Sequence, residues 1–327
     1  MSRYAEHVLT AWGLCMRTIF GNENETFAER TTAVGLGNFD GLHVGHMALI
    51  NTLTNEARIN GQRSIIYTFT KHPENILRKK LFTPLLTTVG KRIQLLEGTA
   101  LDYLYFDEFD ENFSRLRPEN FVCEVLLDRL GARLVVAGFN YRFGYMGQGD
   151  VNLLRELGRK YNFKVIVIPP VKVDNEVVSS TAIRQYVARG DMESVFRLLG
   201  RHYSITGEVM DGKRLGRRIG FPTANLHPEE YLVMPHNGVY ITKTLYNGEF
   251  YSSLTNIGLN PTFGDVARIS AETHILNFDR DIYRSSIEVF FLKKLRNEKK
   301  FKNAEELSAQ IRRDVQIAKE FFDLNGT

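Results

Sequence analysis

Cysteines are scarce in this sequence, and long apolar runs are absent. Its 327 residues include two cysteines, Cys15 and Cys123, which are too few for a disulfide framework or a cysteine-based zinc site. This scarcity favours a reducing compartment. No stretch approaches the roughly 20 apolar residues that a membrane-spanning helix needs. We therefore expect a cytoplasmic protein that does not bind membranes.

The first residues lack the pattern of a secretory signal. Glu6 and His7 interrupt a segment that has no clean apolar core. Met16 provides a second start for the chain, so residues 1–15 are expected to be a start-site artefact or a disordered tail.

A large excess of charge is also absent. The 42 basic and 38 acidic residues leave a formal net charge of +4, which is weak support for nucleic-acid binding and fits anionic small ligands better. With 43% hydrophobic and 24% charged residues, the composition is that of an ordinary globular protein, and the length allows two domains. We expect small molecules as partners, no nucleic acid, and a monomer or weak homo-oligomer.

The first half of the sequence alternates apolar, β-rich runs with amphipathic helical segments. In the segment after His46, the residues Leu49, Ile50 and Leu53 recur on one helical face. Buried strands alternating with crossover helices predict a Rossmann-like α/β domain with a parallel, doubly wound sheet, placed at residues 16–187. The predicted strands are 31–37, 63–69, 102–106, 133–138 and 164–170.

The second half has short strands at close intervals, with glycine, asparagine and aspartate between them. The Asn-Gly pair within residues 246–250 is typical of a tight hairpin. These features predict an antiparallel β-barrel at residues 198–325, closed by one helix over residues 303–322. A single helix over residues 180–200, ending at Gly200, is expected to join the two domains.

A glycine-rich loop, GLGNFDGLHVGH, carries the first candidate site. His43 and His46 are three residues apart at a helix start, where two imidazoles can point the same way and backbone N–H groups attract phosphate. The four glycines between residues 35 and 45 let a bulky anion approach the backbone. A zinc site and a purely structural role for the histidines are the alternatives.

A second cluster opens the helix that begins at residue 180. Ser180 and Thr181 offer hydroxyl groups and Arg184 offers a cation one turn later, which together suit a second anionic group. Ser-Ser-Thr is also a good helix cap, and this is the structural alternative.

The barrel half carries a cationic, glycine-rich segment followed by the tetrapeptide PTAN. Residues 212–220 suit a flexible loop that covers phosphates, although the P-loop pattern does not occur in the sequence. Thr223 and Asn225 offer a hydroxyl and an amide oxygen on one strand face, which suit Mg²⁺, or else they cap a proline-directed turn. Glu272 and His274 share a strand face. Glu272 is then either a base for a substrate hydroxyl or a solvated strand residue.

Seven segments of the sequence together resemble a known family. In order they are GNFDGLHVGH, SSTAIR, LLGRHYSITGEV, GRRIGFPTANL, NIGLNPTFG, ETHILNF and LKKLRNEKKF. The first segment is similar to the wider nucleotidyltransferase superfamily. With all seven segments, the sequence from about Thr32 to Phe321 resembles the prokaryotic bifunctional riboflavin kinase/FMN adenylyltransferase (FAD synthetase) family.

For the first domain, the resemblance implies transfer of the AMP of ATP to FMN, which yields FAD and pyrophosphate. It makes His43 and His46 catalytic, and it puts Asn140 near the flavin phosphate or nucleotide. The residues that it implies for ATP binding are Gly37, Asn38, Asp40, His43, His46, Ser180, Thr181 and Arg184.

For the barrel, the resemblance implies transfer of the γ-phosphate of ATP to the 5′-hydroxyl of riboflavin. Glu272 would be the base, and Thr223 and Asn225 would bind Mg²⁺, the expected cofactor. Riboflavin, FMN and FAD are then substrates and products. The residues implied for ATP binding are Gly212, Lys213, Gly216, Gly220, Asn256 and Arg296.

Three positions of the first domain depart from the family pattern. Gly90 and Phe139 replace acidic residues that relatives often have, and Tyr141 replaces a phenylalanine. A monofunctional riboflavin kinase with a degenerate, structural first domain is therefore one alternative, and a non-catalytic flavin-binding regulator is another. A tRNA synthetase relative is less favoured, because neither an anticodon-binding extension nor a strongly basic face is apparent.

Overall fold

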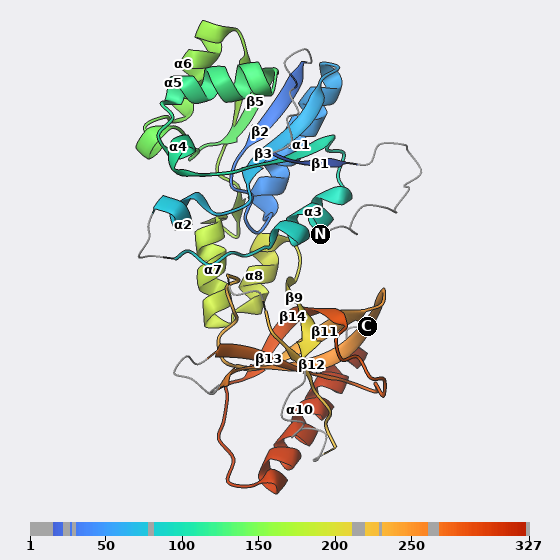
Figure 1. Ribbon diagram of the computed structural model, residues 1–327. Coiled ribbons are helices and arrows are strands. Elements are labelled where there is room, and N and C mark those ends of the chain that lie inside the picture. The colour runs from blue at the N-terminus through green and yellow to red at the C-terminus, as the bar shows by residue number, and fades with distance from the viewer. Residues whose placement is uncertain are drawn as a thin grey trace. The chain divides into compact units, whose positions relative to one another are not determined.

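The computed structural model describes residues 16–21, 27, 31–77, 82–210, 220–228, 231–260 and 268–324 (Figure 1). The chain forms two compact units, Met1–Val178 and Ser179–Thr327. Residues 1–15, for which a tail is expected, lie outside the described residues. Within the described ranges, no helix has both the length and the apolar character to cross a membrane.

The first unit contains a parallel six-stranded sheet in the order β1-β4-β3-β2-β5-β6. The predicted parallel sheet is therefore confirmed. Strands β2 to β6 match the five predicted strands within one or two residues, and β1 is an additional edge strand. The strands are β1 (Arg17–Phe20), β2 (Thr32–Leu36), β3 (Arg63–Phe69), β4 (Tyr103–Asp107), β5 (Ala132–Gly138) and β6 (Lys164–Ile168).

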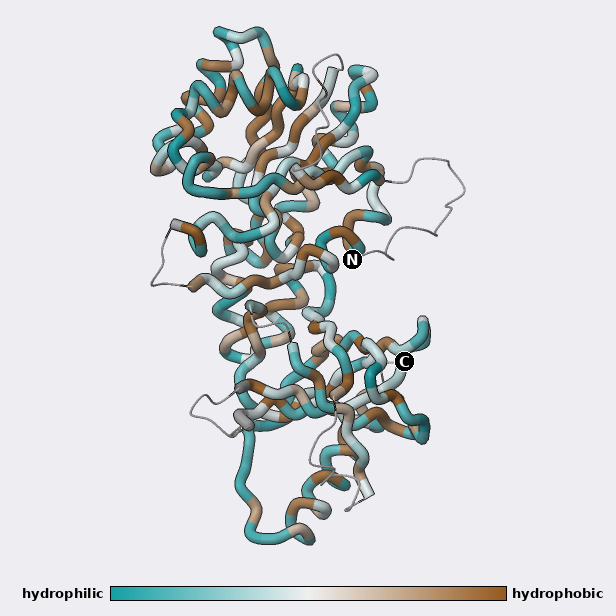
Figure 2. The backbone as a smooth tube through the Cα atoms, viewed as in Figure 1, coloured by the Kyte–Doolittle hydropathy of each residue, from teal (hydrophilic) through white to brown (hydrophobic). Residues whose placement is uncertain are grey.

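Helices cover both faces of this sheet, as a doubly wound fold requires. Helix α1 packs Ile50 and Leu53 on one face, where Leu96 of α3 joins them. The other face is covered by Val122 of the π-helix η1 and Leu154 of α6. Figure 2 shows the apolar character of the strands between these layers. The covering helices are α1 (Val44–Ile59), α3 (Val89–Glu97), η1 (Phe121–Arg129) and α6 (Val151–Tyr161).

Short elements complete the first unit. They lie in the connections between the strands and helices of the two layers. They are α2 (Pro73–Leu77), α4 (Glu111–Ser114), α5 (Pro118–Asn120), the 3₁₀ helix η2 (Tyr145–Gly147), and the strand pair β7 (Lys172–Val173) and β8 (Glu176–Val177).

Two helices, rather than one, occupy residues 180–200. Helix α7 (Ser180–Arg189) ends because Gly190 adopts a left-handed φ of 78°, and Asp191 then caps α8 (Met192–Leu199). The prediction of a single helix is wrong, because a C-terminal glycine and an N-terminal aspartate interrupt a continuous apolar stripe. Helix α7 packs against α8 within the second unit. The functional domain limits, 16–187 and 198–325, stay predictions.

The second unit contains the predicted antiparallel barrel, which is closed in the order β10-β13-β12-β11-β14-β9. Asn247 and Gly248 form the two-residue turn between β11 and β12, and both have positive φ, 50° and 82°, as a type I′ hairpin requires. The strands are β9 (Tyr203–Met210), β10 (Ala224–Leu226), β11 (Gly238–Tyr246), β12 (Glu249–Asn260), β13 (Arg268–Ile275) and β14 (Ser286–Arg296).

A chain of hydroxyl groups lies inside the barrel. It runs over three strands with hydrogen bonds of 2.8–2.9 Å, and all of its members are fully buried. Each hydroxyl can both donate and accept, so the chain satisfies these polar groups within the core. In order, the members are Thr244, Ser253, Thr242, Thr255 and Thr273.

The C-terminal helix α10 (Ala304–Leu324) packs against the barrel, which confirms the predicted closing helix. Ala318 and Phe322 in its second half are buried against Val239, Ile241 and Leu254. The apolar contact therefore fixes the end of α10, and the position of its first half depends on other interactions.

Candidate active sites

The first candidate site lies where the order of the parallel sheet reverses. From β2 the chain adds β3 and β4 on one side and then β5 and β6 on the other. In such sheets, ligands bind at the carboxyl ends of the two strands where the order reverses. Residues 37–43 follow β2, and Asn140 follows β5, which pairs with β2 at Leu36 and Ala137. The topology therefore brings the histidine loop and Asn140 to one edge.

His43 and His46 stack on each other at the start of α1. Their ring centroids are 3.6 Å apart and their planes differ by 9°. His43 is the N-cap of α1, and its Nδ1 accepts the backbone N–H of His46 at 3.1 Å. Because Nδ1 accepts, the neutral His43 ring carries its proton on Nε2, which is then a donor. The predicted common direction of the two rings is confirmed, and His43 also has a structural role as a cap.

The loop between β2 and α1 is strained and firmly anchored. A left-handed conformation costs a non-glycine residue about 1–2 kcal/mol. Asp40 is buried, and its carboxylate accepts the Leu86 and Thr87 N–H groups at 2.9–3.0 Å and the Thr87 hydroxyl at 3.2 Å. Asp40 thus fixes the loop, and its contact with ATP stays a prediction. The residues with positive φ are Phe39 (48°), Gly41 (87°) and Leu42 (41°).

The glycines of this segment serve different purposes. Gly35 lies inside β2, where a Cβ would stand 2.7 Å from the Ile66 side chain and 2.9 Å from that of Leu53. It therefore permits close packing of α1 on the sheet rather than the approach of an anion. A Cβ on Gly45 would lie 3.2 Å from the His43 ring, so Gly45 makes room for that imidazole. Gly37, which remains a predicted ATP contact, lies half-buried at the start of the loop.

A buried arginine, Arg92, contacts the same loop. Arg92 of α3 is 4% exposed and donates from Nη1 to Phe69 O at 2.9 Å and from Nη2 to Thr70 O at 3.2 Å. Nη1 also lies 3.5 Å from Asn38 O. Burial lowers the pKa of Arg92 to about 10, an effect that the charge of Asp40 opposes. Arg92 is therefore a cation at neutral pH.

At the start of α7, Ser179 is the helix cap. Its side chain accepts the Ala182 N–H at 3.2 Å. Ser180 and Thr181 are consequently the first two residues of the helix, and Arg184 lies one turn later. Thr181 is exposed, while Ser180 and Arg184 are half-buried. The binding of a triphosphate by these three residues stays a prediction.

In the barrel, three predicted site residues lie in one row across neighbouring strands. Glu272 of β13 pairs with Asn225 of β10 on one side and with Asn256 of β12 on the other. Directly paired residues of antiparallel strands are close and share a face. The row therefore sets one carboxylate between two amides. His274, on the same face of β13, is half-buried like Glu272, as the alternation predicts.

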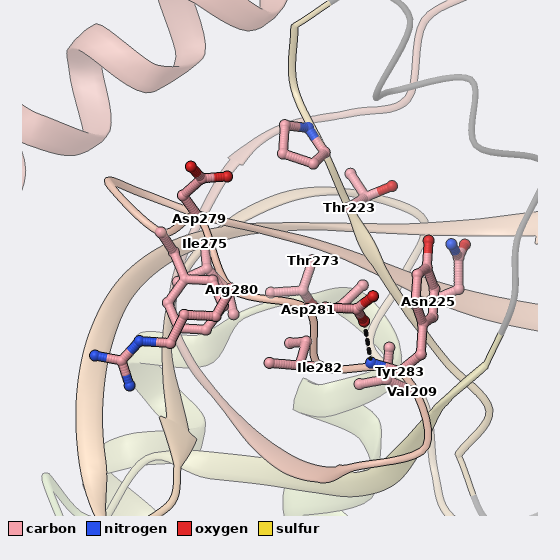
Figure 3. A pocket seen from close by; sticks show the side chains of 13 residues that line it. Val209, Thr223, Asn225, Thr273, Ile275, Asp279, Arg280, Asp281, Ile282 and Tyr283 are labelled. Carbon is pink, nitrogen blue, oxygen red and sulfur yellow. Dashed lines mark hydrogen bonds between the residues drawn. The ribbon is translucent and has the colours of Figure 1, made fainter.

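A cavity of about 300 Å³, the β10 pocket, lies beside this row. Thr223 and Asn225 stand on one side of it, and Asp279 and Arg280 on the other (Figure 3). Asp281 accepts the Tyr283 N–H at 3.1 Å, which orders the loop after β13. The lining residues are Val209, Pro222, Thr223, Ala224, Asn225, Thr273, Ile275, Phe278, Asp279, Arg280, Asp281, Ile282 and Tyr283.

A second cavity, of about 280 Å³, lies against α10 and is called the α10 pocket. Thr223 lines both cavities, so the two pockets meet at this residue. The walls of the α10 pocket combine aromatic and aliphatic side chains with polar and charged ones, including Glu272. The lining residues are Phe221, Thr223, Val239, Leu254, Asn256, Glu272, His274, Arg296, Glu298, Lys299, Phe301, Leu307, Ile311 and Asp314.

An ion pair between β14 and α10 forms part of the wall of the α10 pocket. Nε of Arg296 donates to the Asp314 carboxylate at 2.9 and 3.1 Å, and Nη2 donates at 2.8 Å. Gln310 Nε2 donates to the same carboxylate at 2.9 Å. Asp314 is 2% exposed. Arg296 therefore ties α10 to the barrel beside Asn256 and Glu272, and its predicted contact with ATP stays a prediction.

His274 lines the α10 pocket and contacts the segment before Thr223. Its Nδ1 lies 2.8 Å from Pro222 O, and its ring meets Phe221 edge-on with centroids 5.5 Å apart. Burial lowers the pKa of His274, and the bond to the Pro222 carbonyl opposes that change. His274 thus holds the segment that leads into Thr223.

The oxygens of Thr223 and Asn225 fit a magnesium ion that arrives with a nucleotide. Mg²⁺ prefers hard oxygen ligands and usually keeps phosphates and waters among them. Among the described residues, no group of three or more histidines, cysteines, aspartates and glutamates lies together as a metal cage. Gly212, Lys213 and Gly216 of the predicted covering loop lie outside the described residues, whereas Gly220 is a turn residue with φ of 85°.

Arg92 and Asp314 are the residues near the sites that the motifs do not reveal. Each interrupts an apolar stripe: Arg92 lies between Val89 and Leu96 on α3, and Asp314 lies on the buried face of α10. A charged residue on the apolar face of a helix needs a partner when it is buried. That pattern is the signal by which both residues are recognisable in the sequence.

Comparison with known proteins places the two units in two family descriptions. Residues 26–182 match FAD synthetase, and residues 199–322 match riboflavin kinase. A bifunctional riboflavin kinase/FMN adenylyltransferase of Escherichia coli K12 is 35% identical over 94% of this chain and 99% of its own length. Two further proteins of the same name are similar to this chain. The one from Listeria monocytogenes is 36% identical over 94% of this chain and 98% of its own length. The one from Buchnera aphidicola subsp. Schizaphis graminum is 35% identical over 94% of this chain and 100% of its own length.

A solved structure gives the same architecture. The crystal structure of a protein described as a macrolide-efflux protein from Streptococcus pneumoniae has a TM-score of 0.84 and 29% sequence identity. The match covers 92% of this chain and 98% of that one. The likeness shows that the two chains share a fold.

Proposed function

The chain belongs to the bifunctional riboflavin kinase/FMN adenylyltransferase family, and from this premise we propose that its barrel makes FMN and its first unit converts FMN into FAD. Relatives with both activities in their names match almost the whole chain. A monofunctional kinase and a non-catalytic flavin binder are therefore not favoured. The observation that carries the kinase assignment is that two pockets meet at Thr223, beside the Asn225–Glu272–Asn256 row.

The chemistry of the two pockets supports one substrate in each. The α10 pocket has Phe221, Phe301 and several aliphatic side chains, which suit the flat isoalloxazine ring of riboflavin. The β10 pocket has apolar walls with polar groups at both sides, which suit ATP. We assign riboflavin to the α10 pocket and ATP to the β10 pocket. Asn256 and Arg296 line the α10 pocket beside Glu272, and their contact with ATP stays a prediction.

The kinase step follows from this arrangement. The 5′-oxygen of riboflavin attacks the γ-phosphorus of ATP, a new O–P bond forms, and the bond to the β-phosphate oxygen breaks to release ADP. Glu272 accepts the hydroxyl proton. Thr223 and Asn225 would bind Mg²⁺, which neutralises phosphate charge when bound. Positioning and charge neutralisation carry most of this reaction.

The adenylyl transfer is assigned to the loop between β2 and α1. A phosphate oxygen of FMN attacks the α-phosphorus of ATP, and the bond to the β-phosphate breaks to release pyrophosphate. His43 and His46 would donate hydrogen bonds to the charge that develops on the leaving group. The start of α1 adds a partial positive charge at the same place. Asn140, across the switch point, would contact the flavin phosphate or the nucleotide.

The remaining predictions rest on the sequence. Riboflavin, FMN and ATP fit the activities of the family as small-molecule partners. Mg²⁺ as the cofactor, a monomeric or weakly associated state and a cytoplasmic location stay predictions.

One end-point assay tests the proposal. The full chain is incubated with riboflavin, ATP and Mg²⁺, and riboflavin, FMN and FAD are separated by chromatography. We expect FMN first and FAD later, with ADP and pyrophosphate as the other products. FMN without FAD would leave the kinase alone, and the appearance of neither flavin product would refute both assignments.

A further inference from the structure

The segment that runs from Leu86 into α3 contacts the loop of residues 37–43, which precedes α1 and ends at His43. Thr87 accepts the Gly41 N–H at 2.9 Å and donates to Asp40 at 3.2 Å. One turn later, Arg92 reaches the main-chain carbonyls at the carboxyl ends of β2 and β3. The sequence distances are large: Asp40 and Leu86 are 46 residues apart. These contacts are therefore tertiary ones, made specifically at the loop.

Arg92 contacts carbonyl groups at the edge of the sheet where a ligand is expected. Ligands bind outside the carboxyl ends of parallel strands, and an unpaired C=O group that pointed toward a ligand there would present its negative end. For a triphosphate, such dipoles are repulsive. Arg92 binds Phe69 O and Thr70 O, and Thr68 Oγ1 holds Asn38 O at 3.0 Å. A buried guanidinium thus places positive charge at this edge and, together with Thr68, holds Asn38 of the loop.

Two features of this loop and of Arg92 cost free energy of folding. Two non-glycine residues of the loop, Phe39 and Leu42, are left-handed. Arg92 is almost fully buried, and within the described residues its Nε has no hydrogen-bond partner. Strained backbone and buried charge persist where the surrounding structure over-determines them, which is typical of binding and catalytic loops.

We propose that Arg92, together with Thr87, is a positioning residue for adenylyl transfer: it holds the strained loop so that His43 and His46 face the triphosphate of ATP. This inference rests on the proposed function of the first unit. Arg92 does not touch the substrate and acts through the main chain of the loop. Loss of its hydrogen bonds should displace these donors, and a misplacement of about 1 Å can cost about 10²-fold in rate.

The test compares FAD formation with FMN formation by the same full-length chain. For Arg92→Met, kcat of FAD formation from supplied FMN should fall about 10²-fold, with KM for ATP and FMN changed by less than about threefold. FMN formation from riboflavin should equal that of the wild type, which shows that the barrel is folded, and a retained cooperative unfolding transition of the first unit shows the same for that unit. Thr87→Val, which keeps the side-chain shape, should lower the same kcat about tenfold. Lys91→Met removes a neighbouring charge of α3 and should leave both activities unchanged.

Arg92→Lys supplies a readout that depends on the charge. Burial, which lowers the pKa of Arg92, would also lower the pKa of a lysine at this position, because it disfavours the charged form. FAD formation by Arg92→Lys should therefore exceed that of Arg92→Met at neutral pH and decline toward alkaline pH, where the buried lysine loses its charge. Neither FMN formation nor the wild-type enzyme should show this decline.

Three results would overturn the inference. Wild-type rates of FAD formation in Arg92→Met would show that the arginine positions nothing. A loss of FAD formation accompanied by a lowered Tm of the first unit, with no recovery in Arg92→Lys, would show a purely structural role. If the wild-type chain formed FMN but no FAD, the adenylyltransferase assignment itself would fail, and the role of Arg92 in it with it.

Discussion

Removal of the Asp314 carboxylate should loosen the first half of α10 and weaken riboflavin binding. The apolar contacts of α10 lie mainly in its second half, at Ala318 and Phe322. Beside the α10 pocket, the carboxylate of Asp314 receives three hydrogen bonds from Arg296 and one from Gln310. Asp314→Ala removes all four and leaves the guanidinium of Arg296 without its anion.

The magnitude follows from burial. Breaking a buried ion pair by removing one partner costs about 3–5 kcal/mol. The Arg296 side chain is 23% exposed and can turn partly toward water, so the lower end, about 3 kcal/mol, applies. For a unit of this size, that corresponds to a decrease in Tm of about 6–12 °C. If half of the free energy is needed to restore the pocket on binding, KM for riboflavin rises about tenfold.

The assay measures FMN formation at varied riboflavin together with thermal unfolding. Asp323→Ala is the matched control, since Asp323 is an exposed carboxylate on the same helix and its loss should change stability by less than about 0.5 kcal/mol. FAD formation from supplied FMN should be unaffected in both variants. If Asp314→Ala kept the wild-type Tm and the wild-type KM for riboflavin, the ion pair could not be what positions α10.

Four further outcomes are expected. His46→Ala should reduce FAD formation by about 10²–10³ and spare FMN formation, because one charge-stabilising donor is lost; equal loss of both products, measured by chromatography, would mean that the histidines maintain the fold. Asn225→Ala should abolish FMN formation and leave FAD formation from supplied FMN, and retained kinase activity would place the metal site elsewhere. Thr242→Val leaves Ser253 and Thr255 without their shared partner and should destabilise the barrel by about 1–3 kcal/mol in denaturant unfolding. For His274, burial lowers the pKa in the folded state below the usual 6.5, so the unfolded chain takes up the proton first as the pH falls. The free energy of unfolding should therefore decline below pH 6.5, and it should decline less in His274→Gln. The same pH dependence in both proteins would contradict this prediction.

The sequence by itself determined the architecture and most of the chemistry. Apolar periodicity located five of the six parallel strands, and the Asn247-Gly248 pair fixed the hairpin of the barrel, because backbone geometry sets these patterns locally. The positions of His43 and His46 at a helix start followed from the same reasoning. The alternation of Glu272 and His274 predicted their common face. These features depend on neighbours within a few residues.

The sequence pattern failed where two local signals competed. The apolar stripe of residues 180–200 is continuous, yet Gly190 and Asp191 end one helix and start another. Strand β1 has four residues and gains its place only by pairing with β4. Short segments carry too little periodicity to be recognised before their partner strand is known.

Tertiary structure alone decided which groups the buried charges bind. Asp40 is anchored by residues 46 positions away, Arg92 collects carbonyls from two strand ends, and Asp314 binds an arginine of another element. The row of Asn225, Glu272 and Asn256 likewise exists only in the register of three strands. A buried polar group must find a partner, but the chain segment that supplies it is chosen by the folded arrangement as a whole.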